Sequence, residues 1–154
     1  MYGTQRGTAY GYSLFDFNVY GQPVDIAAGK PATASSVKGS NPDRVAAKAF
    51  DGDSGTRWGS EYVDPSWIRV DLGTSRSITG VRLNWEAGYG RSYQIQVSDD
   101  AVTWTTVHTT TTGDGGVDLI DGLTAQGRYV RMYGTQRGTA YGYSLWDFQV
   151  FGTP

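Results

Sequence analysis

Several segments of this 154-residue chain place aromatic and charged side chains within a few positions of one another. Aromatic faces stack on the apolar C–H faces of sugars, whereas guanidinium and carboxylate groups hydrogen-bond to sugar hydroxyls. These segments therefore predict a carbohydrate-binding surface, provided that the fold brings them together. The side chains concerned are Arg57, Glu61, Tyr62, Glu86, Tyr89, Arg91 and Tyr141.

Each of these side chains also has a structural interpretation. Arg57 and Glu86 are equally compatible with an ion pair that holds two loops together. Tyr143 is compatible with packing beneath its own loop. Tyr141 is the best candidate for ligand contact, because it stands between Ala140 and Gly142 in a loop where burial has little claim on it.

The segment FDGDSGT carries a second kind of chemistry. It places the carboxylates of Asp51 and Asp53 at alternate positions of a glycine-containing loop, with the hydroxyl of Thr56 three residues further on. Such a loop can surround a hard cation, which takes six to eight oxygen ligands. An ordinary turn in which Asp51 bonds to its own backbone explains the same residues. The spacing alone leaves both alternatives open.

Catalysis has little support in the sequence. Glycoside hydrolysis needs two carboxyl groups about 5–9.5 Å apart across a cleft, and nothing distinguishes Glu61 and Glu86 from solvated loop acids. The chain has one histidine, His108 in a Thr-rich segment, and no cysteine. We therefore predict a binding domain and no enzyme.

The composition limits the partners. The net charge is −2 and the pI is about 5.2, whereas nucleic acids and anionic membranes require a basic surface. No apolar run reaches the length of a membrane span. We expect neither nucleic-acid binding nor membrane insertion. The absence of cysteine excludes disulfides and is compatible with a secreted bacterial protein.

The elements that must position these side chains are strands. Short alternating segments are separated by Gly- and Asp-rich turns, a pattern typical of an all-β sandwich. Residues 45–50 could form one helical turn, and four tryptophans, Trp58, Trp67, Trp85 and Trp104, are interpreted as core residues. The predicted strands are residues 30–37, 67–72, 77–85, 92–98, 103–110, 117–123, 128–134 and 145–152.

Residues 1–21 and 132–152 carry nearly the same sequence. They differ at three positions, where Phe15, Asn18 and Tyr20 replace Trp146, Gln149 and Phe151. Such internal repetition indicates tandem modules. We interpret residues 1–21 as the closing hairpin of a preceding repeat and residues 22–154 as one complete domain.

The duplication also predicts self-association. One domain has a single place for the closing hairpin, and the C-terminal copy has the higher effective concentration there. The N-terminal copy would keep an apolar face in water at a cost of about 25 cal/mol per Å². We expect it to dock, either by strand exchange with a neighbouring molecule or by displacing the C-terminal copy.

The motifs AFDGDSGTRW, WIRVDLG, NWEAGYGRSYQIQVSDDAVTW, GRYVRMYGT and YGYSLWDFQVFG, in this order, resemble the discoidin, or coagulation factor 5/8 type C, superfamily. Within it the chain is most similar to carbohydrate-binding module family 32. The resemblance implies a galactose-binding-domain-like jelly-roll β-sandwich of about eight main strands, with the ligand held by loops at one end. Such modules commonly belong to secreted or cell-surface bacterial glycoside hydrolases.

The resemblance also implies roles for particular residues. A structural calcium ion would be bound by the main chain near Phe50 and by Asp51, Asp53, Thr56 and Asp147. The positions of Arg57, Tyr62, Glu86 and Tyr141 match ligand contacts in relatives that bind amino sugars. Lys38 stands where those relatives have an acid, so that cationic glucosamine polymers become less favoured and neutral β-glucans more so.

We therefore predict a non-catalytic module that binds a polysaccharide, either a β-glucan or a chitosan-type glucosamine polymer, and targets an attached secreted glycoside hydrolase. The alternative is an adhesive or structural repeat that self-associates or binds another protein.

Overall fold

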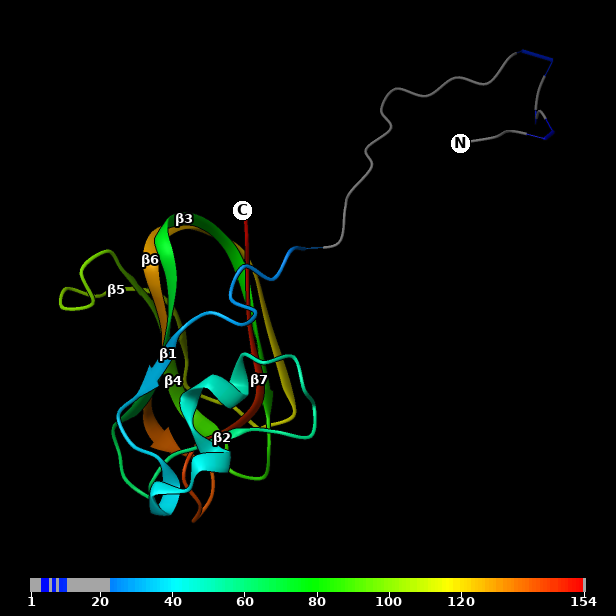
Figure 1. Cartoon of the computed structure of the whole chain (residues 1–154). Helices are drawn as coiled ribbons and strands as arrows, with labels where there is room; N and C mark the ends of the chain where they lie inside the picture. Colours follow the sequence, from blue (N-terminus) through cyan, green and yellow to red (C-terminus); the bar gives the residue numbers. More distant parts are fainter. Residues whose placement is uncertain (1–3, 6, 8, 11–22, 154) are drawn as a thin grey trace.

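In the computed structural model of the chain, residues 4, 5, 7, 9, 10 and 23–153 are described. Seven antiparallel strands form one continuous hydrogen-bonded sheet, in the order β2-β7-β3-β6-β4-β5, with β1 paired to β3. Three short 3₁₀ helices precede β2 (Figure 1). The elements are β1 (Ala32–Ala34), η1 (Lys38–Ser40), η2 (Pro42–Arg44), η3 (Ala46–Ala49), β2 (Trp58–Gly59), β3 (Ser66–Trp85), β4 (Gly90–Ser98), β5 (Thr105–Thr110), β6 (Val117–Arg137) and β7 (Ser144–Gly152).

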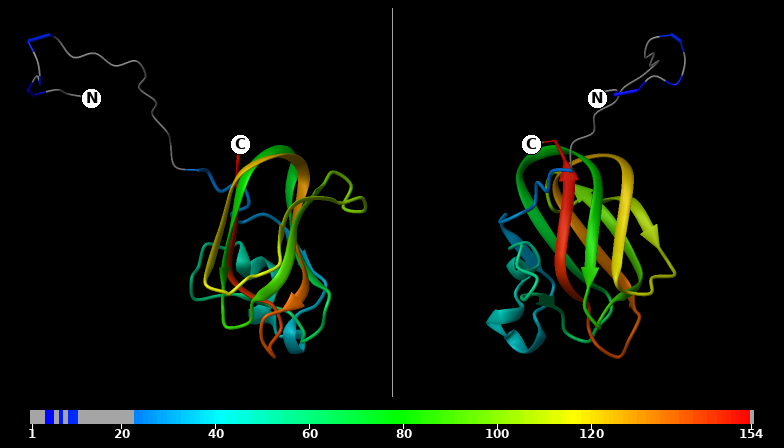
Figure 2. Two further views of the ribbon diagram at one scale, coloured as in Figure 1. Left: turned by 180° about the vertical axis from the view of Figure 1, so that it is seen from behind. Right: turned by 90° about the vertical axis from the view of Figure 1, so that its right-hand side faces the viewer.

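The sheet becomes a sandwich because its two longest strands bend. The first half of β3 pairs with the second half of β6, and the second half of β3 lies between β7 and the first half of β6. The register shifts between Asp71 and Arg76. Gly73 and Gly122 have φ values of 88° and 74° near the bends, a conformation that favours glycine. Both strands thus pass through both layers, as their arches in Figure 1 and Figure 2 show.

These bends explain the difference between the predicted and observed strands. The all-β sandwich is confirmed, but the predicted strands 67–72 and 77–85 are the two halves of β3. The predicted strands 117–123 and 128–134 are likewise the two halves of β6. The described residues therefore form seven strands where eight were expected, with the two-residue β2 as an addition. The expected helical turn is present as η3.

The core lies between the two layers and confirms only half of the tryptophan prediction. Trp58 and Trp85 are buried, with 0% and 4% of their surface exposed. Trp67 and Trp104 are half-buried on the outer surface, so that their assignment to the core was wrong. Arginine covers both: the Cζ of Arg69 lies 5.2 Å from the Trp67 ring, and the Cζ of Arg131 lies 3.9 Å from the Trp104 ring. Stacking by guanidinium groups allows a large aromatic ring to remain at the surface.

The first and last parts of the domain meet at one end. Asp25 forms a β-bridge with Phe151, and the Ile26 amide donates to the Val150 carbonyl at 2.9 Å. The helix η1 and the connections that follow β2, β3 and β6 lie at the opposite end (Figure 1). Among the described residues, no helix is long and apolar enough to cross a membrane.

The C-terminal copy of the duplicated segment fills the closing position in its own domain. It forms the end of β6 and all of β7, and it buries Met132, Tyr143, Phe148 and Val150 completely. Most of residues 1–21 lie outside the described residues, so self-association through them stays a prediction.

The full chain is expected to scatter light as dimers or larger species at high concentration, whereas a chain beginning at Val24 stays monomeric. Monomeric masses for both chains would contradict it.

Candidate functional site

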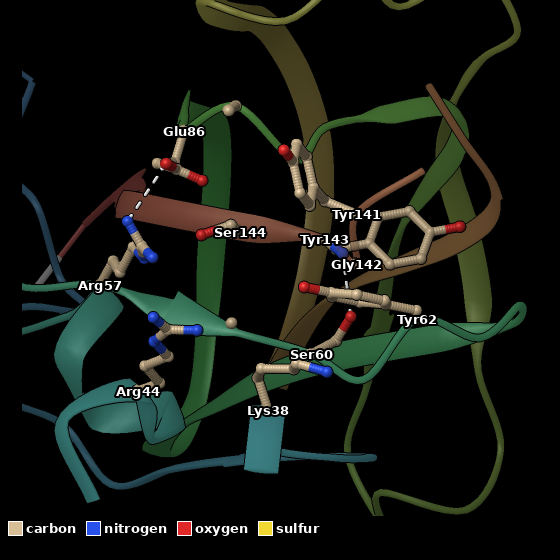
Figure 3. A pocket seen from close by; sticks show the side chains of 12 residues that line it. Lys38, Arg44, Arg57, Ser60, Tyr62, Glu86, Tyr141, Gly142, Tyr143 and Ser144 are labelled. Carbon is tan, nitrogen blue, oxygen red and sulfur yellow. Dashed lines mark hydrogen bonds and ion pairs between the residues drawn. The ribbon is translucent and has the colours of Figure 1, made fainter. Parts of the chain in front are cut away.

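A cleft of about 280 Å³ lies at the end of the sandwich away from the Asp25–Phe151 bridge, and Figure 3 shows side chains that line it. Its walls come from segments that are far apart in the sequence: the 3₁₀ helices, the residues around β2, the turn after β3 and the loop before β7. The lining residues are Lys38, Arg44, Arg57, Gly59, Ser60, Tyr62, Glu86, Ala87, Tyr141, Gly142, Tyr143 and Ser144.

Two tyrosines provide the aromatic part of the cleft. Tyr62 and Tyr141 are 44% and 57% exposed, and their ring centroids lie 6.1 Å apart at an interplanar angle of 72°. The Nζ of Lys38 lies 3.7 Å from the centroid of the Tyr62 ring. Because large aromatic rings are normally buried, two exposed rings on one cleft form a ready surface for the apolar face of a sugar.

A pair of opposite charges lies across the cleft from the tyrosines. The Nη1 of Arg57 and the Oε1 of Glu86 are 3.2 Å apart, and both side chains are about three-quarters buried, with 24% and 25% of their surface exposed. The ion pair, one of the two alternatives for these residues, is therefore present, and Figure 3 shows both groups pointing into the cleft. The pair fixes a donor and an acceptor in position for neighbouring sugar hydroxyls.

The loop that carries Tyr141 is held down by its neighbours. Ser60 and Tyr143 exchange hydrogen bonds: the Ser60 amide donates to the Tyr143 carbonyl at 2.8 Å, and the Tyr143 amide donates to the Ser60 hydroxyl at 2.9 Å. The Ser144 amide donates to the Gly88 carbonyl at 2.7 Å. The buried Tyr143 hydroxyl donates to the Asp64 carboxylate, and burial together with this carboxylate raises the pKa of Tyr143. Tyr143 thus packs under its loop and anchors Tyr141 above it.

Three of the eight predicted ligand contacts do not line the cleft. Glu61 accepts a 2.6 Å hydrogen bond from the Gly39 amide, which with Lys38 at 3.4 Å lowers the pKa of Glu61. The ring of Tyr89 packs against Gly138, where a side chain would collide with it. Arg91 is exposed on β4. Lys38, Arg57, Tyr62, Glu86 and Tyr141 do line it.

Other residues that line the cleft were not predicted from the sequence, among them the polar Arg44 and Ser60. Arg44 ends η2 and points into the cleft, where Figure 3 shows it beside Arg57. Its position depends on the packing of η2 against β2, and the spacing of residues along the chain does not predict that contact. Ser60 follows β2 directly, a two-residue strand too short to give a pattern.

The acidic loop gathers oxygen atoms around one hydroxyl. The Oγ1 of Thr56 lies 2.8 and 2.9 Å from the two carboxylate oxygens of Asp51, 3.2 Å from the Asp53 carbonyl and 3.3 Å from the Lys48 carbonyl. A hydroxyl can donate only one hydrogen bond, so at most one of these oxygens receives the Thr56 proton at a time. Burial alone would raise the pKa of Asp51, but hydrogen bonds from the Asp53 amide and Thr56, together with Lys48, lower it. The carboxylate is therefore present as the anion that a hard cation prefers.

Asp147 and the main chain at Phe50, the other positions that the resemblance implies for calcium, have partners elsewhere in the fold. The Asp147 carboxylate lies 3.4 Å from the Nη1 of Arg82, and among the described residues no three acidic, His or Cys side chains converge on a metal position. The calcium ligands that the resemblance implies include main-chain oxygens and the Thr56 hydroxyl besides carboxylates, so this site stays a prediction. Burial raises the pKa of Asp147, and the negative charges of Asp25 and Asp51 raise it further. The Phe50 carbonyl accepts a hydrogen bond from the Gly29 amide at 2.7 Å.

The bent two-layer sheet with a loop-built cleft at one end defines a discoidin-like β-sandwich. Comparison with known families matches residues 31–148 to the F5/8 type C domain. The chain belongs to this family, and the resemblance inferred from its motifs is confirmed.

Two solved structures that share about half of their residues with this chain are modules of one enzyme. Chitosan-binding module 1 of a chitosanase/glucanase from Paenibacillus sp. IK-5 is 54% identical, with a TM-score of 0.79 over 84% of this chain and 99% of that one. Chitosan-binding module 2 of the same enzyme, solved in complex with chitotriose, is 45% identical, with a TM-score of 0.80 over 83% and 100% of the two chains.

More distant relatives share the fold. A family 32 carbohydrate-binding module of Clostridium perfringens NanJ, in complex with galactose, is 18% identical with a TM-score of 0.69. Among curated proteins, the polysaccharide lyase 8 family protein HylA of Enterococcus faecalis is 32% identical over 132 residues. That match covers 79% of this chain but only 10% of HylA, so the chain spans about a tenth of that relative.

Proposed function

We propose that this domain is a non-catalytic module that binds a polysaccharide in the cleft at the end of its sandwich. The observation that carries the proposal is the exposed Tyr62–Tyr141 pair facing the Arg57–Glu86 ion pair. Together these side chains offer an apolar surface and fixed hydrogen-bonding groups, the two features that a sugar ring requires. The similarity to modules described as chitosan-binding supports the same function.

The carboxylates of the site argue against hydrolysis. Glycosidases use two carboxyl groups that face the scissile bond, whereas Glu86 is the one carboxylate that lines this cleft among the described residues. The nearby Glu61 is held by Gly39 and Lys38, and its pKa is lowered, the opposite of what a general acid needs. The cleft therefore has no acid–base pair.

Binding can be tested with a panel of soluble oligosaccharides. Tyr62, Tyr141 and the nearby Trp146 should make intrinsic fluorescence sensitive to a sugar in the cleft, so that a fitting glycan shifts or quenches the emission. The panel should include oligomers of glucosamine and of β-linked glucose. An adhesive repeat that binds only protein would leave the emission unchanged for every glycan.

The choice between these two sugars depends on charge. Three cationic residues, Lys38, Arg44 and Arg57, line the cleft against the single carboxylate of Glu86. This excess of positive charge favours a neutral β-glucan, whereas the similarity to chitosan-binding modules favours glucosamine. Glu61 reconciles the two in part, because its carboxylate lies 3.4 Å from the Lys38 ammonium and offsets its charge. We propose that a chitosan-type polymer is bound and that Lys38 weakens its binding.

Replacing Lys38 by glutamate is expected to strengthen binding of glucosamine oligomers by about three- to tenfold at a pH where their amines are charged, as expected for one exposed charge contact. Affinity for neutral glucose oligomers should not rise. Titration calorimetry of both ligand series measures the ratio directly. Lys38→Gln is the control, with a smaller gain, and an equal change for both sugars would contradict the electrostatic explanation.

We further propose that the acidic loop holds a structural calcium ion. Asp51, the Asp53 and Lys48 carbonyls and the Thr56 hydroxyl already bring several oxygens within reach of one point. A bound cation would supply the positive charge that one hydroxyl proton cannot. In this arrangement Lys48, 3.5 Å from Asp51, competes with the metal, and the main chain at Phe50 and the carboxylate of Asp147 complete the surroundings.

Removal of calcium is therefore expected to lower the melting temperature by several degrees, because a ligand that binds only the folded state stabilises it by mass action. Calorimetry of the protein with added calcium and with a chelator makes the comparison. Asp51→Asn should melt at the same temperature in both conditions. Identical melting of the wild-type protein in both conditions would contradict a calcium site.

The relatives named above also suggest a setting for the domain. We propose that it belongs to a secreted or cell-surface bacterial protein in which it targets an attached glycoside hydrolase or lyase to its substrate.

A further inference from the structure

A second hollow adjoins the cleft and shares a wall with it. It has a volume of about 420 Å³, and the side chains of Arg44 and Arg57 line both spaces. Because the two spaces meet at these arginines, a chain of sugars leaving the cleft on this side would pass into the hollow. The lining residues are Asn41, Asp43, Arg44, Lys48, Gly55, Thr56, Arg57 and Trp146.

Trp146 reaches this hollow because β7 contains a bulge. Leu145 is paired with Trp85, and Asp147 is paired with Asn84, so Trp146 has no partner on β3. A bulge of this kind redirects a side chain and is over-represented next to binding sites. Trp146 is half-buried, and the Cζ of Arg57 lies 5.2 Å from the centroid of its ring.

Two polar side chains of the hollow, those of Asp43 and Arg44, have no partner among the residues that the structure describes. Within the described part of the chain, the carboxylate of Asp43 and the guanidinium of Arg44 make no hydrogen bond or ion pair; only their backbone groups bond, to Asn41. An aromatic ring beside an uncommitted acceptor and an uncommitted donor repeats the composition of the cleft itself.

We propose that this hollow is a second sugar subsite, which takes a residue of the polysaccharide next to the one held in the cleft. The inference rests on the proposed polysaccharide-binding function and extends it to ligand length. The part of the Trp146 ring that Arg57 leaves open packs on the sugar, while Asp43 and Arg44 bond to its hydroxyls. In a glucosamine polymer the Asp43 carboxylate also accepts from the amine.

The test compares oligosaccharides of increasing length. Wild-type protein is titrated with glucosamine oligomers from the dimer to the pentamer, and the affinity is expected to rise about tenfold once the chain reaches both spaces, the effect of one additional aromatic contact. Trp146→Ala should abolish this increase, so that long oligomers bind no more tightly than short ones. Trp146→Phe is the matched control, because the duplicated segment carries Phe15 at this position, and it should keep most of the increase.

The ratio of long-chain to short-chain affinity separates the subsite from its alternatives. If Trp146 only holds Arg57 in place, Trp146→Ala will weaken short and long oligomers by the same factor, and the proposal is wrong. It is also wrong if wild-type affinity does not depend on length. If the cleft does not bind sugar at all, the result is distinguishable, because every oligomer would then bind Tyr141→Ala as tightly as the wild type.

A second variant tests the hollow even if Trp146→Ala fails to fold. Asp43 is exposed, so Asp43→Asn should leave the melting temperature unchanged. It is expected to weaken long glucosamine oligomers about threefold to fivefold and glucose oligomers less, whereas the dimer is unaffected. Unchanged affinity for the long glucosamine oligomers would overturn the role of this hollow.

Discussion

Replacing Tyr141 by alanine is expected to remove most glycan binding without unfolding the domain. One stacking tyrosine and a few exposed hydrogen bonds should give the wild-type module a dissociation constant of roughly 10 µM to 1 mM, or about −4 to −7 kcal/mol. Loss of the ring, which is 57% exposed, removes the larger part of the apolar contact while leaving the core intact. The expected loss is at least about tenfold, measured by calorimetric titration with the best glycan of the panel.

Tyr141→Phe is the matched control, since it keeps the ring and removes only the hydroxyl. It should retain binding to within a few-fold. Equal melting temperatures for the three proteins would show that the fold is unaffected. Normal binding by Tyr141→Ala would mean that sugars bind elsewhere on the domain.

Gly142→Ala is expected to disrupt the same loop from below and to destabilise the whole domain. A Cβ at this position would lie 2.6 Å from the Ser60 hydroxyl and 2.7 Å from the Glu61 carbonyl. Because most of the neighbouring atoms are backbone, they cannot rotate away, and the loop must lift off β2. We expect a loss of about 2–4 kcal/mol in the free energy of unfolding, in the range of other overpacked buried sites. Denaturant unfolding followed by tryptophan fluorescence measures it.

Gly59→Ala provides the comparison at a less crowded glycine that also lines the cleft. The nearest atom to its Cβ would be the Cδ of Arg44 at 3.6 Å, an ordinary van der Waals contact with a flexible side chain. This variant should lose less than about 1 kcal/mol. Similar losses in both variants would show that the close contacts of Gly142 do not determine the stability of the loop.

Features that depend on neighbouring residues were predicted from the sequence, whereas features that depend on contacts between distant segments were not. Alternating segments such as residues 67–72 predicted strands correctly, because alternation is a local consequence of having one buried face. The bends that join this segment to residues 77–85 were not visible, since they depend on how two long strands fold over one core. Arg44 was missed for the same reason: it lines the cleft only through the packing of η2 against β2.

Tyr89 and Arg91 show the limit of spacing within a turn. Both stand close to Glu86 in the sequence, and all three were predicted to contact ligand. The chain leaves the cleft at this point to begin β4 at Gly90, so the Tyr89 ring turns toward Gly138 and Arg91 faces solvent. Trp67 and Trp104 illustrate the complementary error, because hydrophobicity alone does not show that an arginine will cover an aromatic ring.

Asp25 and Phe151, near the start and the end of the domain, lie side by side at one end of the sandwich, and this has a consequence for a tandem protein. The duplicated segment ends at Gly21, the counterpart of Gly152, and Val24 follows within a few residues. In a tandem protein, a very short linker would thus join the preceding module to the next one at the end of the sandwich opposite the cleft. Two such neighbouring modules would adjoin at the ends that lack the clefts, and their clefts would face away from each other. A pair built in this way would tie two polysaccharide strands together rather than grip a single strand twice, and would act as a cross-link within the substrate.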